Sequence, residues 1–157
     1  MDQKIKGNKI KLIIGIGNPG EEYKGTYHNV GLLFADYLIE KISLVSGKFP
    51  LLRRGFNGWA ISKNFQYIKT QKVIFVKTTA FMNKSGEAVR EVMLYFGLKP
   101  ENLLLLHDDA DIGLGEQRLV FGRGAAGHKG VESVTRVLKT RDFWRFKPER
   151  HWIKTHT

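Results

Sequence analysis

The sequence has no cysteine and no long apolar run. Among its 157 residues, the absence of cysteine excludes disulfide bonds and thiolate chemistry, and it suits a cytoplasmic location. No apolar run approaches the roughly 18 residues of a membrane span, and no secretory leader pattern opens the chain. We therefore expect a cytoplasmic protein with no membrane association.

Acidic residues are scarce relative to basic ones. The chain has 26 Lys and Arg against 15 Asp and Glu, a formal net charge of +11. Such an excess favours a polyanionic partner such as nucleic acid, although a basic surface that serves only solubility is equally compatible with it. Because Arg/Gly repeats and long basic runs are absent, we expect a folded basic face rather than a disordered arm.

The length and composition are those of one compact domain. A chain of 157 residues can bury a sizeable core, and 42% hydrophobic with 26% charged residues is ordinary for a globular protein. We predict a single domain over residues 1–157. Residues 1–9 are polar and basic and are expected to form a leader before the first strand.

Hydrophobic patterns predict strands that alternate with helices. Strands are expected at residues 10–17, 51–53, 59–63, 72–77, 103–106 and 117–121, and helices at about 29–44, 81–96 and 131–138. Thr78 and Thr79 are expected to cap the second helix, and Gly113 and Gly115 to form the turn of a hairpin-like pair. The fold class is α/β, with a mixed, mostly parallel β-sheet flanked by helices.

A glycine pattern ends the first predicted strand. Its glycines are Gly15, Gly17 and Gly20. A dinucleotide site with this pattern needs a helix that opens directly on the turn and an acidic residue about 20 positions later. Here Pro19 and Gly25 delay the helix, and Glu40 falls inside it. A nucleotide-binding protein is therefore a poorly supported alternative.

Polar side chains follow three of the apolar strands. Asn18 and His28 follow the first, Asn83 follows the strand at 72–77, and Asp108 follows the strand at 103–106. If these strands are parallel neighbours, the four groups converge on one crevice. A neutral imidazole can take a proton from water, a carboxylate can fix its tautomer, and carboxamides can hold a substrate carbonyl. Each residue also has a structural explanation, as a capping, turn or helix-entry residue.

Two other kinds of site fit less well. Asp108, Asp109 and Asp111 could bind a divalent cation, but their spacing matches no calcium-loop rule. Ser85 and Ser133 lie inside helical patterns without the strand-turn-helix elbow of a serine nucleophile. We therefore predict no metal and no serine nucleophile.

Four motifs, in this order, resemble bacterial-type peptidyl-tRNA hydrolases. They are Gly17-Asn18-Pro19-Gly20 with Tyr23 and His28-Asn29, Thr79-Ala80-Phe81-Met82-Asn83-Lys84-Ser85-Gly86, His107-Asp108-Asp109-Ala110-Asp111, and Gly124-Ala125-Ala126-Gly127-His128-Lys129-Gly130. The resemblance covers about residues 11–146. It implies a monomeric enzyme without cofactors that cuts the ester between a peptide and the 3′ ribose of tRNA and so recycles tRNA for translation.

The resemblance also implies residue roles. His28 would be the general base, Asp108 would orient it, and Asn18 and Asn83 would hold the substrate and the attacked carbonyl. Further substrate or tRNA contacts are expected from Tyr23, Asn29, Met82, Arg123, His128 and Lys129. Lys129 stands where many members have Asn, so a cation replaces a carboxamide there. Arg136 and Lys139 are expected to join Arg123 and Lys129 in neutralising tRNA phosphates.

The end of the chain departs from the family pattern. After Arg145, members continue into an apolar, glycine-bearing strand and a helix that covers the cleft. Residues 147–157 show neither, and Pro148 argues against an inner strand. We expect an atypical tail, truncated or read from a shifted frame, and a fold of marginal stability. A non-catalytic RNA-binding relative is therefore the alternative function.

Overall fold

The computed structural model describes residues 10–46, 59–113 and 115–149. They form a seven-stranded sheet in the order β2-β3-β4-β1-β5-β7-β6. The strands are β1 (Leu12–Gly15), β2 (Ala60–Ile61), β3 (Phe65–Lys69), β4 (Ile74–Thr78), β5 (Leu103–Leu106), β6 (Arg118–Phe121) and β7 (Trp144–Lys147). The α-helices are α1 (Val30–Ser46), α2 (Ser85–Phe96) and α3 (Lys129–Leu138), and short 3-10 helices are η1 (Glu21–Tyr23), η2 (Tyr27–Asn29), η4 (Met82–Lys84) and η5 (Pro100–Asn102).

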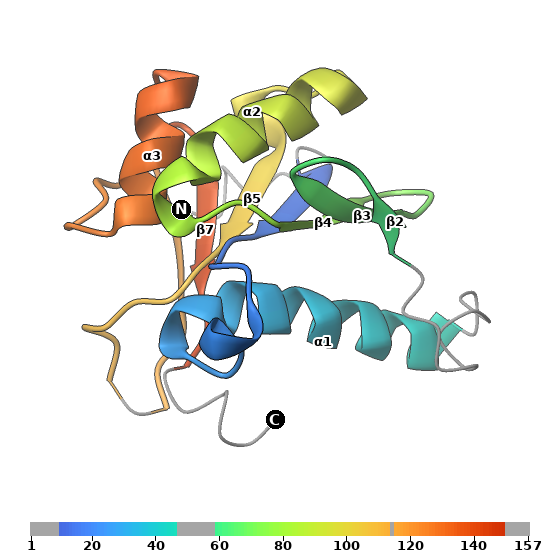
Figure 1. The fold of residues 1–157 in the computed structure, drawn as a ribbon, viewed down its shortest axis with the longest axis horizontal. Coiled ribbons are helices and arrows are strands. Elements are labelled where there is room, and N and C mark those ends of the chain that lie inside the picture. The colour runs from blue at the N-terminus through green and yellow to red at the C-terminus, as the bar shows by residue number, and fades with distance from the viewer. Residues whose placement is uncertain (1–9, 47–58, 114, 150–157) are drawn as a thin grey trace.

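The four central strands, β4, β1, β5 and β7, run parallel. On one edge β3 and β2 are antiparallel, and on the other β6 runs antiparallel to β7. Helix α1 covers one face of the sheet, and α2 and α3 cover the other (Figure 1). This arrangement confirms the predicted α/β class with a mixed, mostly parallel sheet.

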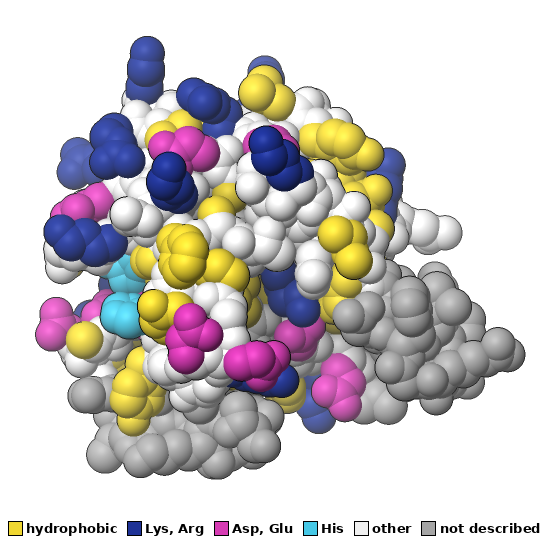
Figure 2. Space-filling model, viewed as in Figure 1, with side chains coloured by type: hydrophobic (Ala, Val, Ile, Leu, Met, Phe, Trp, Pro, Cys, Tyr) yellow, Lys and Arg dark blue, Asp and Glu magenta, His cyan; other side chains and the backbone are white. Residues whose placement is uncertain are grey.

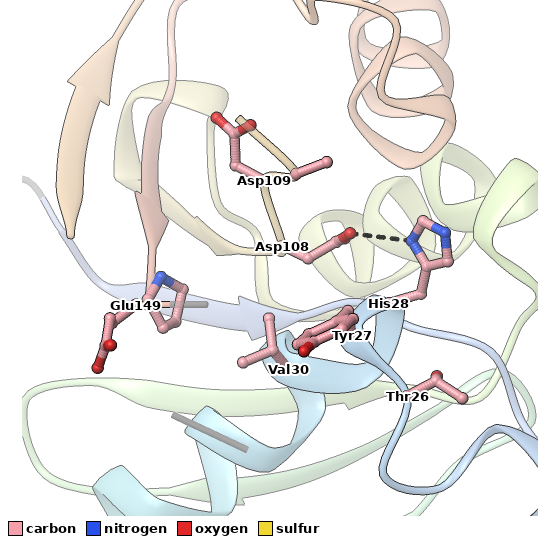
Figure 3. Close-up of a pocket in the computed structure, with 9 residues that line it drawn as sticks. Thr26, Tyr27, His28, Val30, Asp108, Asp109 and Glu149 are labelled. Atoms are coloured by element: carbon pink, nitrogen blue, oxygen red, sulfur yellow. Dashed lines mark ion pairs between the residues drawn. The ribbon is translucent and has the colours of Figure 1, made fainter. Parts of the chain in front are cut away.

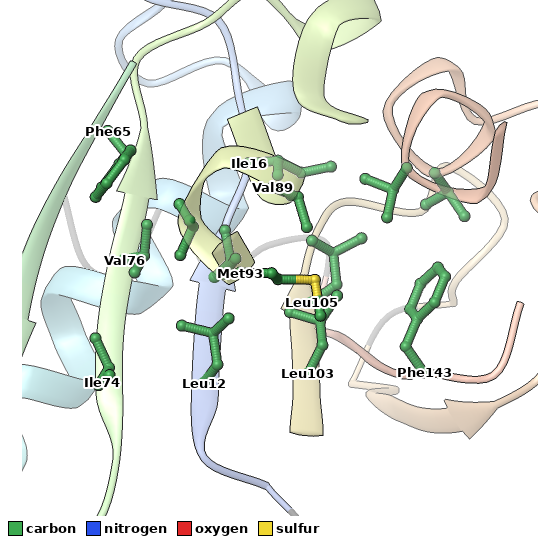
Figure 4. Packing of buried hydrophobic residues seen from close by; sticks show 14 of the residues in the cluster. Leu12, Ile16, Phe65, Ile74, Val76, Val89, Met93, Leu103, Leu105 and Phe143 are labelled. Carbon is green, nitrogen blue, oxygen red and sulfur yellow. The ribbon is translucent and has the colours of Figure 1, made fainter. Parts of the chain in front are cut away.

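Both faces of the central strands are buried, which explains why these strands are continuous apolar runs. Leu12 and Ile14 of β1 belong to the core beneath α2 and α3 (Figure 4), whereas Ile13 packs into the core on the α1 side. The same alternation places Leu105 in the first core and Leu106 in the second. Each fully buried aliphatic side chain contributes roughly 1.5–3 kcal/mol.

Close packing of glycines brings α1 against the carboxyl ends of β1 and β5. A Cβ atom on Gly31 would lie 2.3 Å from the Leu106 carbonyl oxygen, and one on Gly15 would lie 2.3 Å from the Gly31 carbonyl oxygen. Any larger residue would push the helix off the sheet. Gly15, the first residue of the glycine pattern, thus serves helix packing. Because α1 begins only at Val30, no helix opens directly on the glycine turn, which does not favour a dinucleotide site.

Several predicted details are wrong. Strand β6 pairs with β7 rather than in a hairpin turned at Gly113 and Gly115. Thr78 is a buried residue of β4, and neither it nor Thr79 caps α2, which follows η4 without a side-chain cap. Strand β3 was not predicted, because the polar residues Asn64 and Gln66 lie at its start. The predicted strand at residues 51–53 and the leader at 1–9 lie outside the described residues.

The prediction that Pro148 argues against an inner strand near the chain end is also wrong. Strand β7 is an inner strand, held between β5 and β6, and it ends at Lys147. Pro148 follows directly, so it ends the strand instead of preventing it. The sheet therefore keeps the strand whose loss was expected to make folding marginal. Within the part of the chain that the structure describes, no helix combines the length and apolarity needed to cross a bilayer.

Candidate active site

The polar residues predicted from the sequence meet at the carboxyl edge of the sheet. Because β4, β1 and β5 are adjacent and parallel, the loops after them lie side by side, as predicted from the sequence. The loops after β1 and β4, together with residues 127–129, line a cavity of about 600 Å³. Its lining residues are Asn18, His28, Phe81, Met82, Asn83, Lys84, Gly127, His128 and Lys129.

His28 and Asp108 are in direct contact. His28 Nδ1 lies 2.9 Å from Asp108 Oδ2, and the side chains are 64% and 11% exposed, respectively (Figure 3). Because Nδ1 lies this close to an ionised carboxylate, which only accepts hydrogen bonds, we assign the proton of the neutral ring to Nδ1. The Nε2 lone pair is then free to take a proton from water.

Asp108 binds a second imidazole with its other oxygen. His128 Nε2 lies 2.7 Å from Asp108 Oδ1. His128 is also the N-cap of α3, where its Nδ1 accepts hydrogen bonds from the Gly130 and Val131 N–H groups at 3.1 and 3.2 Å. A ring whose Nδ1 accepts must carry its proton on Nε2. His128 is therefore committed as a hydrogen-bond donor to Asp108.

These contacts keep Asp108 ionised. Burial alone would raise the pKa of the Asp108 carboxyl, but the hydrogen bond from His128 and the electrostatic influence of His128, His28 and His107 together lower this pKa below its ordinary value. An ionised Asp108 can both orient His28 and stabilise its imidazolium form.

Asn18 is held in place by the backbone around it. Its N–H donates to Asn29 Oδ1 at 2.7 Å, and Asn29 Nδ2 donates back to the Asn18 carbonyl at 2.9 Å. Asn18 Oδ1 accepts from the Met82 N–H at 2.7 Å. This leaves the Nδ2 group of Asn18 as the donor available to a ligand. Asn29 itself is buried behind the cavity, where it positions Asn18.

The other predicted contact residues lie in different places. Met82 and Lys129 line the cavity, and Tyr23 packs edge-on against Phe81, with ring centroids 6.4 Å apart. Arg123 does not line it; this residue borders a separate hollow of about 480 Å³ beside β6.

A second cavity, of about 310 Å³, also has His28 in its lining (Figure 3). Its lining residues are Thr26, Tyr27, His28, Val30, Asp108, Asp109, Ala110, Pro148 and Glu149. Sequence reasoning assigned no role to Tyr27 or Glu149, and no pattern in the sequence marks them. Lys147 donates to Asp109 at 2.7 Å; although burial raises the pKa of Asp109, this bond lowers it overall.

His28, Asp108 and His128 could also be considered as metal ligands, since their ligand atoms lie within 4.8 Å of one another. However, His128 could bind a metal through Nε2 only by giving up its single ring proton or the cap of α3. Asp109 is likewise occupied by Lys147 and by the Asp111 N–H. The donor set thus suits a hydrogen-bonded site better than a metal centre.

Two buried residues behind the site were not predicted. His107 and Arg145 are 1% and 2% exposed. Burial, and then the electrostatic influence of His128 and Arg145, lowers the pKa of His107 to about 3, so its ring is neutral. The available signals were the position of His107 next to Asp108 and a charged residue within a strand.

An oriented imidazole beside two carboxamides can activate water against an acyl group, which defines the class of site as hydrolytic. Comparison with known proteins gives the family. The family model for peptidyl-tRNA hydrolase matches residues 12–148. The peptidyl-tRNA hydrolase of Mesoplasma florum is 35% identical over 91% of this chain and 75% of that relative, and that of Lactobacillus johnsonii is 37% identical over 88% and 70%.

A solved structure agrees. The crystal structure of peptidyl-tRNA hydrolase from Acinetobacter baumannii matches with a TM-score of 0.68 and 25% identity, over 95% of this chain and 75% of that one. The chain belongs to the peptidyl-tRNA hydrolase family. The resemblance and the fold class drawn from the sequence are thereby confirmed.

Proposed function

We propose that this protein hydrolyses the ester bond of peptidyl-tRNA and releases tRNA for reuse in translation. One observation carries the proposal: His28 Nδ1 lies 2.9 Å from the carboxylate of Asp108, and His28 lines a cavity that also presents Asn18 and Asn83. That arrangement has a base, an orienting acid and two carboxamide donors, which are the groups that ester hydrolysis by water requires.

The proposed reaction begins with His28. Its Nε2 takes a proton from a water molecule as the oxygen attacks the ester carbonyl carbon, and Asp108 stabilises the imidazolium that forms. The tetrahedral intermediate then collapses, the bond from carbon to the ribose oxygen breaks, and His28 returns its proton to that oxygen. The products are a peptide with a free carboxyl group and a tRNA with a free 3′ hydroxyl.

Asn18 and Asn83 are the proposed ligands of the carbonyl. Because the Asn18 carboxamide oxygen is bonded to the Met82 N–H, its NH₂ group is the part left to donate. Removing a single donor of this kind typically costs about 2.7–4 kcal/mol of transition-state stabilisation.

Basic side chains beside the site are the proposed tRNA contacts. Figure 2 shows Lys and Arg side chains gathered over α3, next to the histidines. Lys129, Arg136 and Lys139 are exposed, and none of them forms an ion pair with a carboxylate within the described residues. Such cations can neutralise phosphates, and their contribution should weaken with salt. We further propose that the protein works in the cytoplasm as a monomer.

The test is turnover of peptidyl-tRNA, or of an N-acylated aminoacyl-tRNA, by the purified protein. His28→Ala should lower kcat by about 10²- to 10⁴-fold, and KM for the wild type should rise with salt. Lys72→Ala, an exposed change in the turn before β4, removes one positive charge away from the cavity and serves as the control. Equal rates for His28→Ala and the wild type would reject the proposal, and tRNA binding without cleavage would favour the non-catalytic relative.

A further inference from the structure

Arg145 of β7 is a buried guanidinium without a carboxylate partner. It is 2% exposed and forms no ion pair within the described residues. Burial lowers the pKa of Arg145, which reflects the cost of removing its charge from water. An apolar side chain would fill the same space without that cost, so the guanidinium must contribute something other than packing.

What it contributes is a set of directed hydrogen bonds. Arg145 Nη2 donates to the carbonyl oxygens of Arg123 and Gly124, at 3.2 and 3.0 Å. Arg145 Nη1 donates to His107 Nε2 at 3.2 Å. The planar guanidinium therefore fixes the glycine-rich loop before α3 relative to the end of β5.

The bonds continue from both ends of this bridge to Asp108. On the β5 side, His107 accepts at Nε2, so Nδ1 carries its proton and donates to the Asp108 carbonyl oxygen at 2.7 Å. On the loop side, the His128 N–H donates to the Ala125 carbonyl at 3.0 Å, and the His128 ring donates to the Asp108 carboxylate. The rings of His107 and His128 also pack edge to face, with centroids 4.8 Å apart.

These contacts form a closed ring around Asp108, which we call the Arg145 ring: Asp108, His107, Arg145, residues 123–125 and His128. We propose that Arg145 and His107 are positioning residues for the hydrolysis, and that they act by holding His128 and Asp108 at the relative position in which Asp108 orients His28. This inference rests on the proposed function, because it assigns the ring to that reaction.

The experiment compares Arg145→Lys with the wild type. Lysine keeps the charge, but its single nitrogen cannot hold three acceptors in a fixed plane. We expect kcat to fall roughly 10- to 100-fold, as for a small misplacement of catalytic groups, with KM little changed. His107→Gln keeps an acceptor for Arg145 but loses the Nδ1 donor, and it should also lower kcat.

Two further variants separate positioning from loss of stability. Val92→Ala in α2 truncates a fully buried core residue about two turns from the cavity end of the helix. It should lower the melting temperature while kcat stays at the wild-type value. His128→Asn keeps a residue able to cap α3 but shortens the contact that reaches Asp108. In that background Arg145→Lys should change kcat by less than about twofold, because the path from Arg145 to Asp108 is already broken.

The possible outcomes are distinct. Multiplicative losses in the double variant, or a wild-type kcat for Arg145→Lys, would overturn the positioning role while leaving the proposed function intact, provided that His28→Ala is inactive. Absence of turnover in the folded wild type would overturn the proposed function itself.

Discussion

The two sides of Asp108 hold the same kind of side chain in opposite settings. On the outer side His28 is largely exposed, belongs to the short η2, and has one ring nitrogen without a partner among the described residues. On the inner side His128 is nearly buried, and both of its ring nitrogens are engaged. The difference teaches that one carboxylate joins an accessible imidazole, the proposed base, to a structural one. Accessibility and a free lone pair identify the residue that can do chemistry, whereas the number of fixed contacts identifies the residue that supports it.

The largest expected effect comes from removing the charge that both sides share. Asp108→Asn should lower kcat by up to about 10⁴-fold, because an amide has one acceptor oxygen for the two imidazoles and no negative charge to stabilise the imidazolium of His28. Single-turnover kinetics with saturating enzyme would measure the chemical step. A loss of less than about tenfold would mean that His28 does not depend on Asp108.

The next effect distinguishes the two histidines by stability. His128→Ala removes the cap of α3 and should lower the free energy of unfolding by about 0.5–2 kcal/mol. His28→Ala should change it by less than about 0.5 kcal/mol, because its side chain is exposed. Urea denaturation gives both values, and His128→Asn, which retains a capping oxygen, should recover most of the loss. Equal destabilisation by the two alanine variants would contradict the division between them.

A third expectation is a pH dependence of stability on the inner side. The folded pKa of His107, about 3, lies below its ordinary value of 6.5, so the unfolded chain binds the proton more readily. Stability is then fully present above pH 6.5 and falls as the pH drops towards 3, with a slope of at most about 1.4 kcal/mol per pH unit from this group. The lowered pKa of Asp108 adds a loss below its ordinary value of 3.8.

Denaturation curves at successive pH values test this expectation. His107→Gln should flatten the slope between pH 6.5 and 4 relative to the wild type, whereas the exposed His28→Ala should not. A slope that is unchanged in His107→Gln would show that some other group governs acid sensitivity.

The outer side of the site could be predicted from the sequence, and much of the inner side could not. His28, Asn18, Asn83 and Asp108 follow apolar strands, and parallel neighbours necessarily bring such residues to one edge. Arg145 gave no comparable signal, because the pattern of one strand does not reveal which carbonyl groups from another segment will surround a buried charge.

The fold errors have related causes. Strand β7 contains Arg145 and Lys147, and so it lacks the apolar run that marks an inner strand, although its neighbours on both sides bury it. Strand β3 was missed because Gln66 interrupts a short segment that follows the polar Asn64. In both cases pairing with other strands, rather than local preference, decides the structure.

His28 lines the cavity of about 600 Å³ and also the one of about 310 Å³. Its side chain is therefore shared by two cavities of different character, the larger bordered by lysines and the smaller by carboxylates. A small molecule with an acidic group for the larger cavity and a basic group for the smaller one would contact the imidazole from both cavities and shield it from solvent. Inhibitor design could exploit this polarity instead of imitating the ester.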